Sequence, residues 1–252
     1  GDKEVVHLIN ENFEGGGLGV FTGVNSTPNG APYDAITIWQ NETSPYIPLD
    51  TEVWSPAISS GLAGNRFVMS TSDVNPPPAG TVRQFLELTS AVNATNMTGL
   101  TLTFDMFYSV FGDEVRVQVN DGSGWTTVQT YTASVGIGTR FAPQTINLTA
   151  YNNTPSLRFR IQFWSVWGDG IAVDNIKLFG ERPLNTAFNY DTATVDAFTN
   201  ISCAPGTEYT PGTPATTIYI KPTLTQLENA TFTIPVSATL SSGCAATGSV
   251  VV

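Results

Sequence analysis

The sequence holds little of what many catalytic sites are built from. It has one histidine, His7, and only three lysines among its ten basic residues, against 21 acidic residues. A nucleophilic hydrolase of the Ser-His-Asp kind needs a histidine beside its nucleophile, and His7 stands alone near the start of the chain. Two carboxylates could serve a glycosidase, but no spacing singles out a pair. We therefore expect no enzyme, and a β-sandwich hydrolase or lyase is the least favoured alternative.

Charge and long apolar runs are also scarce. Only 12% of the 252 residues are charged, and the net charge is −11. Such a surface repels phosphate backbones, so nucleic acid is not an expected partner. No run approaches the roughly 18 apolar residues of a membrane span, so we expect no membrane insertion. The excess of carboxylates is typical of a secreted or cell-surface protein, whose signal peptide would have been removed, and it offers oxygen ligands to divalent cations.

The chain has only two cysteines, Cys203 and Cys244, both in its last third. Two cysteines with a distant histidine do not make a zinc site. A disulfide between them is our leading interpretation, and two buried free thiols are the alternative.

What the sequence does contain is alternation. The segments "LTLTFDMFY" (100–108), "EVRVQVN" (114–120) and "LRFRIQFW" (157–164) alternate apolar with mostly polar residues. A period of two predicts strands with one buried face. Turn signals separate these segments, and Asp121-Gly122 predicts a hairpin. The sequence therefore predicts an all-β protein.

The outward faces of these strands carry planar polar groups and a tryptophan. Arginine and glutamine donate hydrogen bonds to sugar hydroxyls, and an indole ring offers an apolar plate to a pyranose. If the three strands share a sheet, one ligand-binding surface forms. Alternatively, the arginines only pair with neighbouring carboxylates, and the tryptophan covers the sheet edge. The predicted ligand-binding residues are Asp105, Arg116, Gln118, Arg160, Gln162 and Trp164.

A seam is expected at "GERPLN" (180–185), where the composition becomes rich in Thr, Pro and Ala. We predict a first domain over residues 1–181 and a second over residues 182–252. The roughly 70 residues of the second are enough for a small β-sandwich, which a disulfide would help to stabilise.

An ordered set of segments carries a resemblance to a known family. These are "INENFEGG", "VWSPAISSGLAGNRFVMSTSD", the central hairpin, and a closing strand that ends in "VDNIKL". Together they resemble the β-jelly-roll modules of the MAM, cleaved-adhesin and choice-of-anchor families of secreted bacterial proteins. The resemblance implies a jelly-roll β-sandwich for residues 1–181, and the second domain resembles an immunoglobulin-like sandwich.

The same resemblance implies a structural calcium ion. In related jelly rolls the metal lies where the first and last strands meet, and the corresponding residues here are Glu14 and Asp174, with the carbonyl of Asn12 as a third ligand. Calcium takes six to eight oxygen ligands, which include backbone carbonyls and waters. The alternative is that Asp174 accepts hydrogen bonds from nearby amides while Glu14 is solvated.

These expectations combine into a secreted, non-catalytic adhesin or carbohydrate-binding module with structural Ca²⁺. Its expected partners are a polysaccharide or the glycan of a glycoprotein, together with other domains of a longer chain. The alternative is a purely structural spacer or anchor of a larger secreted enzyme or surface protein.

Overall fold

The computed structural model divides the chain into two compact units. The larger unit is Val5–Arg182, and the smaller comprises Gly1–Glu4 with Pro183–Val252. The division falls at Arg182 and Pro183, inside the segment that the change of composition marks. The structure describes residues 3–26, 37–47, 58–73, 81–183, 188–192, 195–228, 233–239 and 245–251.

Sheet A of the larger unit has six strands in the described part of the chain. Their order is β3-β4-β11-β6-β9, and β1 pairs with β11 beside this path. The pairs β3–β4, β4–β11, β11–β6 and β6–β9 are antiparallel. The bounds are β1 Lys3–Glu11, β3 Gln40–Thr43, β4 Arg66–Thr71, β6 Thr98–Ser109, β9 Ala142–Asn147 and β11 Gly170–Pro183.

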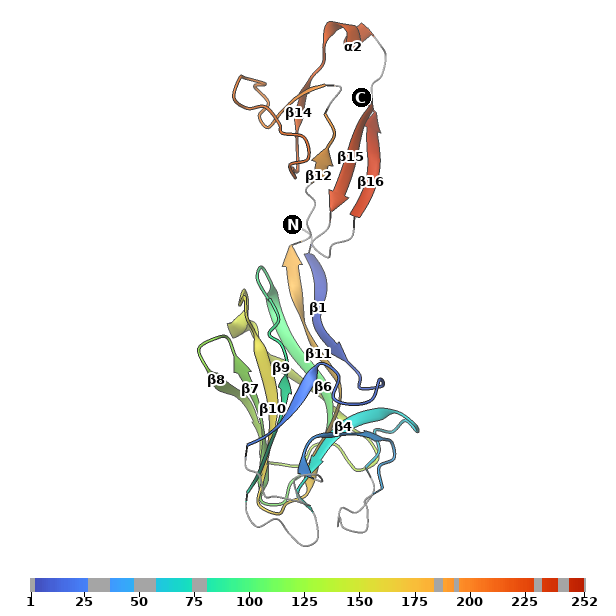
Figure 1. The fold of residues 1–252 in the computed structure, drawn as a ribbon, viewed down its shortest axis with the longest axis vertical. Helices are drawn as coiled ribbons and strands as arrows, with labels where there is room; N and C mark the ends of the chain where they lie inside the picture. Colours follow the sequence, from blue (N-terminus) through green and yellow to red (C-terminus); the bar gives the residue numbers. More distant parts are fainter. Residues whose placement is uncertain are drawn as a thin grey trace. The chain divides into compact units, whose positions relative to one another are not determined.

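Sheet B has five strands among the described residues, in the order β2-β5-β10-β7-β8, all antiparallel. Figure 1 shows β7, β8 and β10 in one layer and β6, β11 and β1 in the other. The short loop 121–124 joins β7 to β8 and confirms the predicted hairpin. The bounds are β2 Phe21–Asn25, β5 Val82–Leu88, β7 Asp113–Asn120, β8 Trp125–Tyr131 and β10 Arg158–Ser165.

The period-two segments form the core of this β-sandwich, as predicted. Burial along β7 alternates without a break, and its three valines are fully buried. Each buried large apolar side chain contributes about 1.5–3 kcal/mol, and facing rows from two sheets exclude water from both. The inner rows of sheet A and sheet B meet in one cluster that includes Leu100, Leu102, Phe104, Met106, Val115, Val117, Val119, Phe159, Ile161 and Phe163.

One expectation about the sheets is wrong. Strand β6, the "LTLTFDMFY" segment, belongs to sheet A, whereas β7 and β10 belong to sheet B. In a two-layer sandwich the polar faces of the two sheets point in opposite directions. Asp105 on β6 is therefore separated from the predicted binding residues of β7 and β10. Phe107, on the same outer face of β6, is buried in a second cluster with Phe67 and Phe141.

The smaller unit holds the three-stranded sheet β12-β15-β16 and the pair β13–β14. A short helix, α2 (Leu224–Glu228), was not expected from the sequence. Its start is fixed locally, because Thr223 Oγ accepts the N–H of Gln226 and Gln226 Oε1 accepts the N–H of Thr223. The strand bounds are β12 Phe188–Tyr190, β13 Asp196–Phe198, β14 Tyr219–Lys221, β15 Thr233–Thr239 and β16 Ala245–Val251.

The predicted disulfide concerns this unit. Cys203 is half-buried with a free thiol, and Cys244 lies outside the described residues, so the pairing stays a prediction. A disulfide that closes the loop between Cys203 and Cys244 would stabilise the smaller unit by about 2–4 kcal/mol. We expect thiol titration of the denatured, unreduced protein to find no free thiol. Two titratable thiols would show that the pair is reduced.

Candidate functional site

The outer face of sheet B arranges its side chains in rows across three strands. Residues paired across an antiparallel sheet point to the same side. Each of three residues of the central strand β10 therefore stands between one residue of β5 and one of β7. The rows are Glu87–Arg160–Gln118, Phe85–Gln162–Arg116 and Arg83–Trp164–Glu114.

All residues of these rows except Glu87 line a groove of about 550 Å³. Five of the six predicted ligand-binding residues lie in it, and the exception is Asp105, on sheet A. The predicted residues that line the groove are Arg116, Gln118, Arg160, Gln162 and Trp164. Sequence reasoning missed three more, Arg83, Phe85 and Glu114. The alternation of "VRQFLEL" (82–88) was the signal that could have placed Arg83 and Phe85 on this face.

Arg160 forms the rigid part of the floor. Its guanidinium lies between two aromatic rings, 3.9 Å from the centroid of Phe85 and 4.1 Å from that of Trp125. Its Nε donates to Gln118 Oε1 at 2.8 Å, and Nη1 is 3.4 Å from Glu87 Oε2. Burial lowers the pKa of Arg160, while Glu87 acts in the opposite sense, and the group stays charged. Packing and hydrogen bonds together fix this side chain.

Arg158 and Arg116 also form ion pairs within the protein. The alternative that the arginines only pair with neighbouring carboxylates is therefore correct for part of the set. Arg158 Nη2 lies 2.5 Å from Glu87 Oε1, and Arg116 Nη2 lies 2.5 Å from Glu114 Oε1. The side chain of Arg116 nevertheless remains 42% exposed, and an exposed ion pair of this kind is worth at most about 1 kcal/mol. Arg116 can therefore turn toward a ligand at low cost.

Gln162 contributes a polar side chain to the groove. The residue is 6% exposed and its amide makes no hydrogen bond to a described residue, but its polar atoms are not sealed from solvent and are reachable from the groove. Trp164, next along the strand, is half-buried and so keeps part of its indole open to the groove. The groove thus offers an unpartnered amide beside an aromatic surface.

The predicted calcium residues lie at sheet A. Asp174 is directly opposite Asp105 in the β11–β6 pairing, and the register shifts just after it, where Asn175 takes a positive φ of 52°. Carboxylates facing each other across strands repel. Asn175 Nδ2 lies between them, 2.9 Å from Asp105 Oδ2 and 3.3 Å from Asp174 Oδ2. The Asn175 backbone N–H also donates to Asp174 Oδ1, at 2.7 Å, so the bulge supplies two neutral donors to the two carboxylates.

Residues Asn65 and Arg66 connect Asp174 to Glu14. Asn65 Nδ2 donates to Asp174 Oδ2, and the backbone N–H of Arg66 donates to Glu14 Oε1, both at 2.9 Å. Asp174 is only 2% exposed. Burial, and secondarily the charges of Asp105 and Glu14, raise its pKa to about 6, against the hydrogen bonds from Asn65 and Asn175 that lower it. The carboxylate is therefore under-compensated.

The donor set suits a hard cation only in part. Among the described residues, no three side chains of His, Cys, Asp and Glu lie close enough together to hold one ion. Asn12, predicted to offer its carbonyl, forms a turn in which its Oδ1 accepts the N–H of Glu14 at 3.3 Å. Two carboxylates would thus need amide or carbonyl oxygens to complete a shell, which calcium accepts. The carboxamide of Asn65 could offer its oxygen by a half turn.

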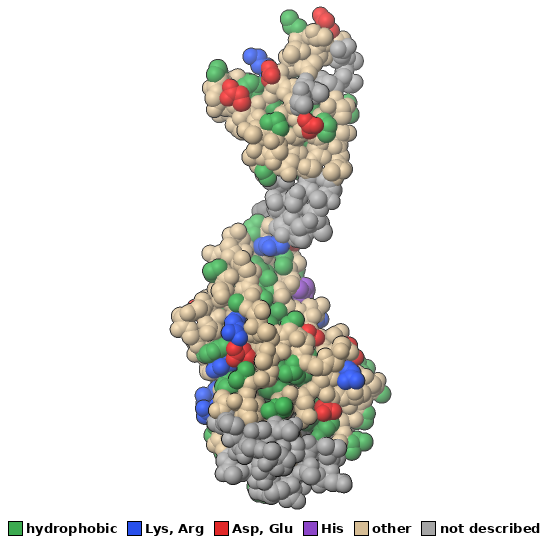
Figure 2. Space-filling model, viewed as in Figure 1, with side chains coloured by type: hydrophobic (Ala, Val, Ile, Leu, Met, Phe, Trp, Pro, Cys, Tyr) green, Lys and Arg blue, Asp and Glu red, His purple; other side chains and the backbone are tan. Residues whose placement is uncertain are grey.

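The rest of the described surface adds little chemistry. Figure 2 shows acidic, basic and hydrophobic side chains scattered over the visible face of the larger unit, with His7 in purple. His7 is exposed, and its ring centroid lies 5.3 Å from that of Phe179. Within the described ranges, no helix has the length and apolarity that crossing a bilayer requires.

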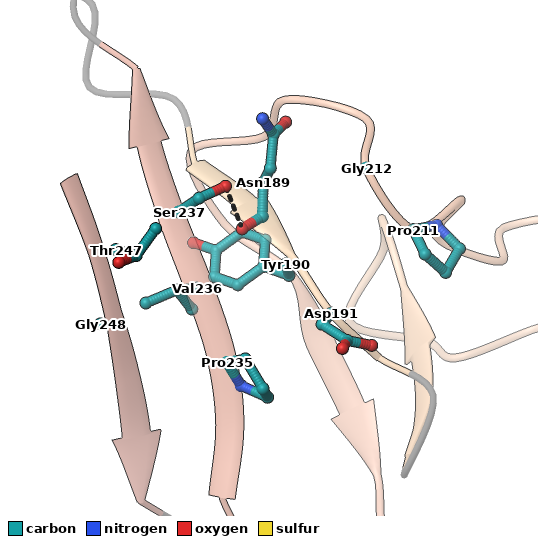
Figure 3. A pocket seen from close by; sticks show the side chains of 10 residues that line it. All are labelled: Asn189, Tyr190, Asp191, Pro211, Gly212, Pro235, Val236, Ser237, Thr247 and Gly248. Carbon is teal, nitrogen blue, oxygen red and sulfur yellow. Dashed lines mark hydrogen bonds between the residues drawn. The ribbon is translucent and has the colours of Figure 1, made fainter. Parts of the chain in front are cut away.

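The smaller unit has a pocket of its own, of about 470 Å³. Figure 3 shows Tyr190, Val236 and Pro235 along it, with β16 on one side and the loop of Pro211 on the other. Asp191 is the one charged residue among those that line it. Its lining includes the polar side chains of Asn189, Ser237 and Thr247, but among the described residues it holds no arginine or tryptophan, and the groove on sheet B remains the candidate site.

No protein-family model and no curated protein sequence matches the chain. Among solved structures, the K3 cleaved adhesin domain of Lys-gingipain from Porphyromonas gingivalis has 16% identity and a TM-score of 0.45, covering 70% of this chain and 99% of that one. The K1 cleaved adhesin domain of the same protein has 16% identity and a TM-score of 0.44, covering 71% of this chain and 98% of that one. TmCBM61, in complex with β-1,4-galactotriose, has 13% identity and a TM-score of 0.44, covering 69% of this chain and 99% of that one. Cleaved adhesin domains are of the type that the sequence resembles, but at such identities the ligand must be inferred from this chain's own side chains.

Proposed function

We propose that the chain is a non-catalytic glycan-binding or adhesion module, and that the groove of sheet B holds the sugar. The observation that carries the proposal is the pair of Gln162, whose amide makes no hydrogen bond to a described residue, and the half-buried Trp164, both of which line the groove. An amide both donates and accepts, as sugar hydroxyls do, and an indole packs against the C–H face of a pyranose. The groove floor is preorganised by Arg160 and its two rings, which limits the entropy lost on binding.

We expect Trp164→Ala to lower retention on a cognate polysaccharide more than tenfold, because the aromatic surface is lost while the buried face of β10 is untouched. Affinity electrophoresis against β-1,4-galactan, xylan, glucomannan and polygalacturonate measures this. Phe179→Ala, an aromatic truncation on β11 in sheet A, is the matched control and should bind normally. Binding on the order of millimolar to micromolar is worth about 4–8 kcal/mol. If the wild type is retained by none of these polysaccharides and binds no glycan on an array, the alternative of a structural spacer is favoured.

A second part of the proposal is structural Ca²⁺ near Glu14 and Asp174. Its support is a buried carboxylate that faces Asp105 across the strands and is compensated by neutral donors of Asn65 and Asn175, including the Asn175 backbone N–H. A bound cation would neutralise this repulsion and tie the turn at Glu14 to β11. The jelly-roll connectivity, the immunoglobulin-like character of the smaller unit and secretion complete the proposal, and they follow from the sequence resemblance.

A further inference from the structure

The face that carries the groove differs in charge from the rest of the protein. The whole chain has 21 acidic and ten basic residues. On the outward rows of β5, β7 and β10 the balance reverses, with four arginines against the two glutamates Glu87 and Glu114, a formal excess of two positive charges. The four arginines are Arg83, Arg116, Arg158 and Arg160. A local positive field on a net negative protein attracts anions to one place and repels them elsewhere.

Two of these arginines are open to a ligand. Arg83 is exposed and has no ion-pair partner among the described residues, and it lines the groove beside Trp164. Arg116 lines the groove one row further along the sheet and is 42% exposed. Arg160, in contrast, is fixed by Glu87, Gln118 and the two rings. The groove therefore holds one guanidinium fixed by its neighbours and two that are largely exposed.

The hydrogen-bond inventory of the groove points the same way. A guanidinium has five N–H donors and no acceptor. The carboxylate of Glu114 and the Gln118 oxygen are already occupied by Arg116 and Arg160. A neutral sugar hydroxyl can accept from a guanidinium N–H, but it carries no charge to balance the cation. A carboxylate or sulfate group accepts from the fork of a guanidinium in a bidentate pair.

We infer that the groove selects an anionic polysaccharide, one whose rings carry carboxylate or sulfate groups. Arg83 and Arg116 bind the acidic group, and Trp164 packs against the sugar ring. The inference rests on the proposed function, and it determines the class of sugar. Of the two arginines, Arg83 gives the clearer test, because binding an anion does not require it to leave a protein partner.

The test uses matched ligand pairs with the full chain. Titration calorimetry compares polygalacturonate with its neutral methyl ester, and dextran sulfate with dextran. We expect one acidic member to bind at least tenfold more tightly than its neutral partner, and raising the salt from about 0.05 to 0.5 M to reduce that preference. Polygalacturonate assigns carboxylate recognition, and dextran sulfate assigns sulfate recognition. Arg83→Gln should weaken the acidic ligand about fivefold or more and leave the neutral one unchanged.

Arg140→Gln is the matched control, since it removes the same charge from an exposed residue outside the groove, and it should change nothing. Equal affinity for the acidic and neutral members, or an unchanged preference in Arg83→Gln, overturns the inference while leaving glycan binding intact. Failure of the proposed function is distinct from this: the wild type then binds no polysaccharide of either kind, or Trp164→Ala binds as well as the wild type.

Discussion

Replacing Gly168 with alanine is expected to lower the free energy of unfolding of the larger unit by about 3 kcal/mol or more. A Cβ at this position would stand 2.6 Å from each of three oxygens, Asp113 Oδ2, Ser165 Oγ and the Phe111 carbonyl. Real Cβ atoms do not approach oxygens so closely, so a neighbour or the backbone has to move.

The neighbours of Gly168 cannot move cheaply. Asp113 is 7% exposed, and its Oδ1 accepts from the Tyr108 hydroxyl and the Phe111 N–H, both at 2.8 Å. The Gly168 N–H in turn donates to the buried Ser72 Oγ and Ser165 Oγ, at 2.9 and 2.8 Å. Relieving the clash therefore breaks buried hydrogen bonds, each costly to leave unmade.

Thermal or urea unfolding in metal-free buffer measures the effect. Gly15→Ala is the matched control, because an added Cβ there meets nothing within 4 Å. It should be neutral or stabilising by up to about 1 kcal/mol, since alanine restricts the unfolded chain. A melting temperature of Gly168→Ala equal to that of the wild type would contradict the packing described around Asp113.

Adding calcium to the metal-free protein is expected to raise the melting temperature of the larger unit by several degrees at pH 7.5. With free ion at about 100 times its dissociation constant, linkage gives about 2.7 kcal/mol. The response should vanish in Asp174→Asn, which keeps the shape of the side chain and removes its charge. If the wild type melts at the same temperature with and without calcium, the calcium proposal fails.

The same carboxylate predicts how stability varies with pH when no metal is bound. The pKa of Asp174 is raised from 3.8 to about 6 in the folded state, so the folded protein holds this proton more tightly than the unfolded chain does. Its contribution therefore makes metal-free protein more stable as the pH falls from 7 through 6 toward 4, by about 3 kcal/mol at most. Calcium competes with the proton, so its stabilising effect should be large at pH 7.5 and small at pH 5.

Melting temperatures measured at pH 7.5 and pH 5, with and without calcium, test both pH effects: the rise in metal-free stability at low pH and the loss of calcium stabilisation there. Metal-free Asp174→Asn should show a smaller gain in stability than metal-free wild type between pH 7.5 and 5, because the titrating group is gone. A wild-type protein whose metal-free stability does not rise between pH 7.5 and 5, relative to Asp174→Asn, would show that Asn65 and Asn175 already satisfy the carboxylate.

Local patterns predicted the strands and the direction of their side chains. The hairpin of β7 and β8 follows from Asp121-Gly122, and the outward positions of Arg116, Gln162 and Trp164 follow from a period of two. Both are properties of a few consecutive residues, because side chains of a strand alternate whatever the strand pairs with. The helix α2 shows the limit of such patterns, because a reciprocal pair of hydrogen bonds between Thr223 and Gln226 marks the start of a turn of helix inside a strand-rich segment.

The sequence by itself determined which residues face out of each strand. The tertiary structure alone decided which strands share a sheet, because pairing joins segments far apart in the chain, such as β5 with β10 and β6 with β11. That decision removed Asp105 from the groove and placed it opposite Asp174. It also brought in Arg83, Phe85 and Glu114, and placed Trp125 over Arg160. The groove and the acidic pair both arise from cross-strand neighbours, which alternation along a single strand does not specify.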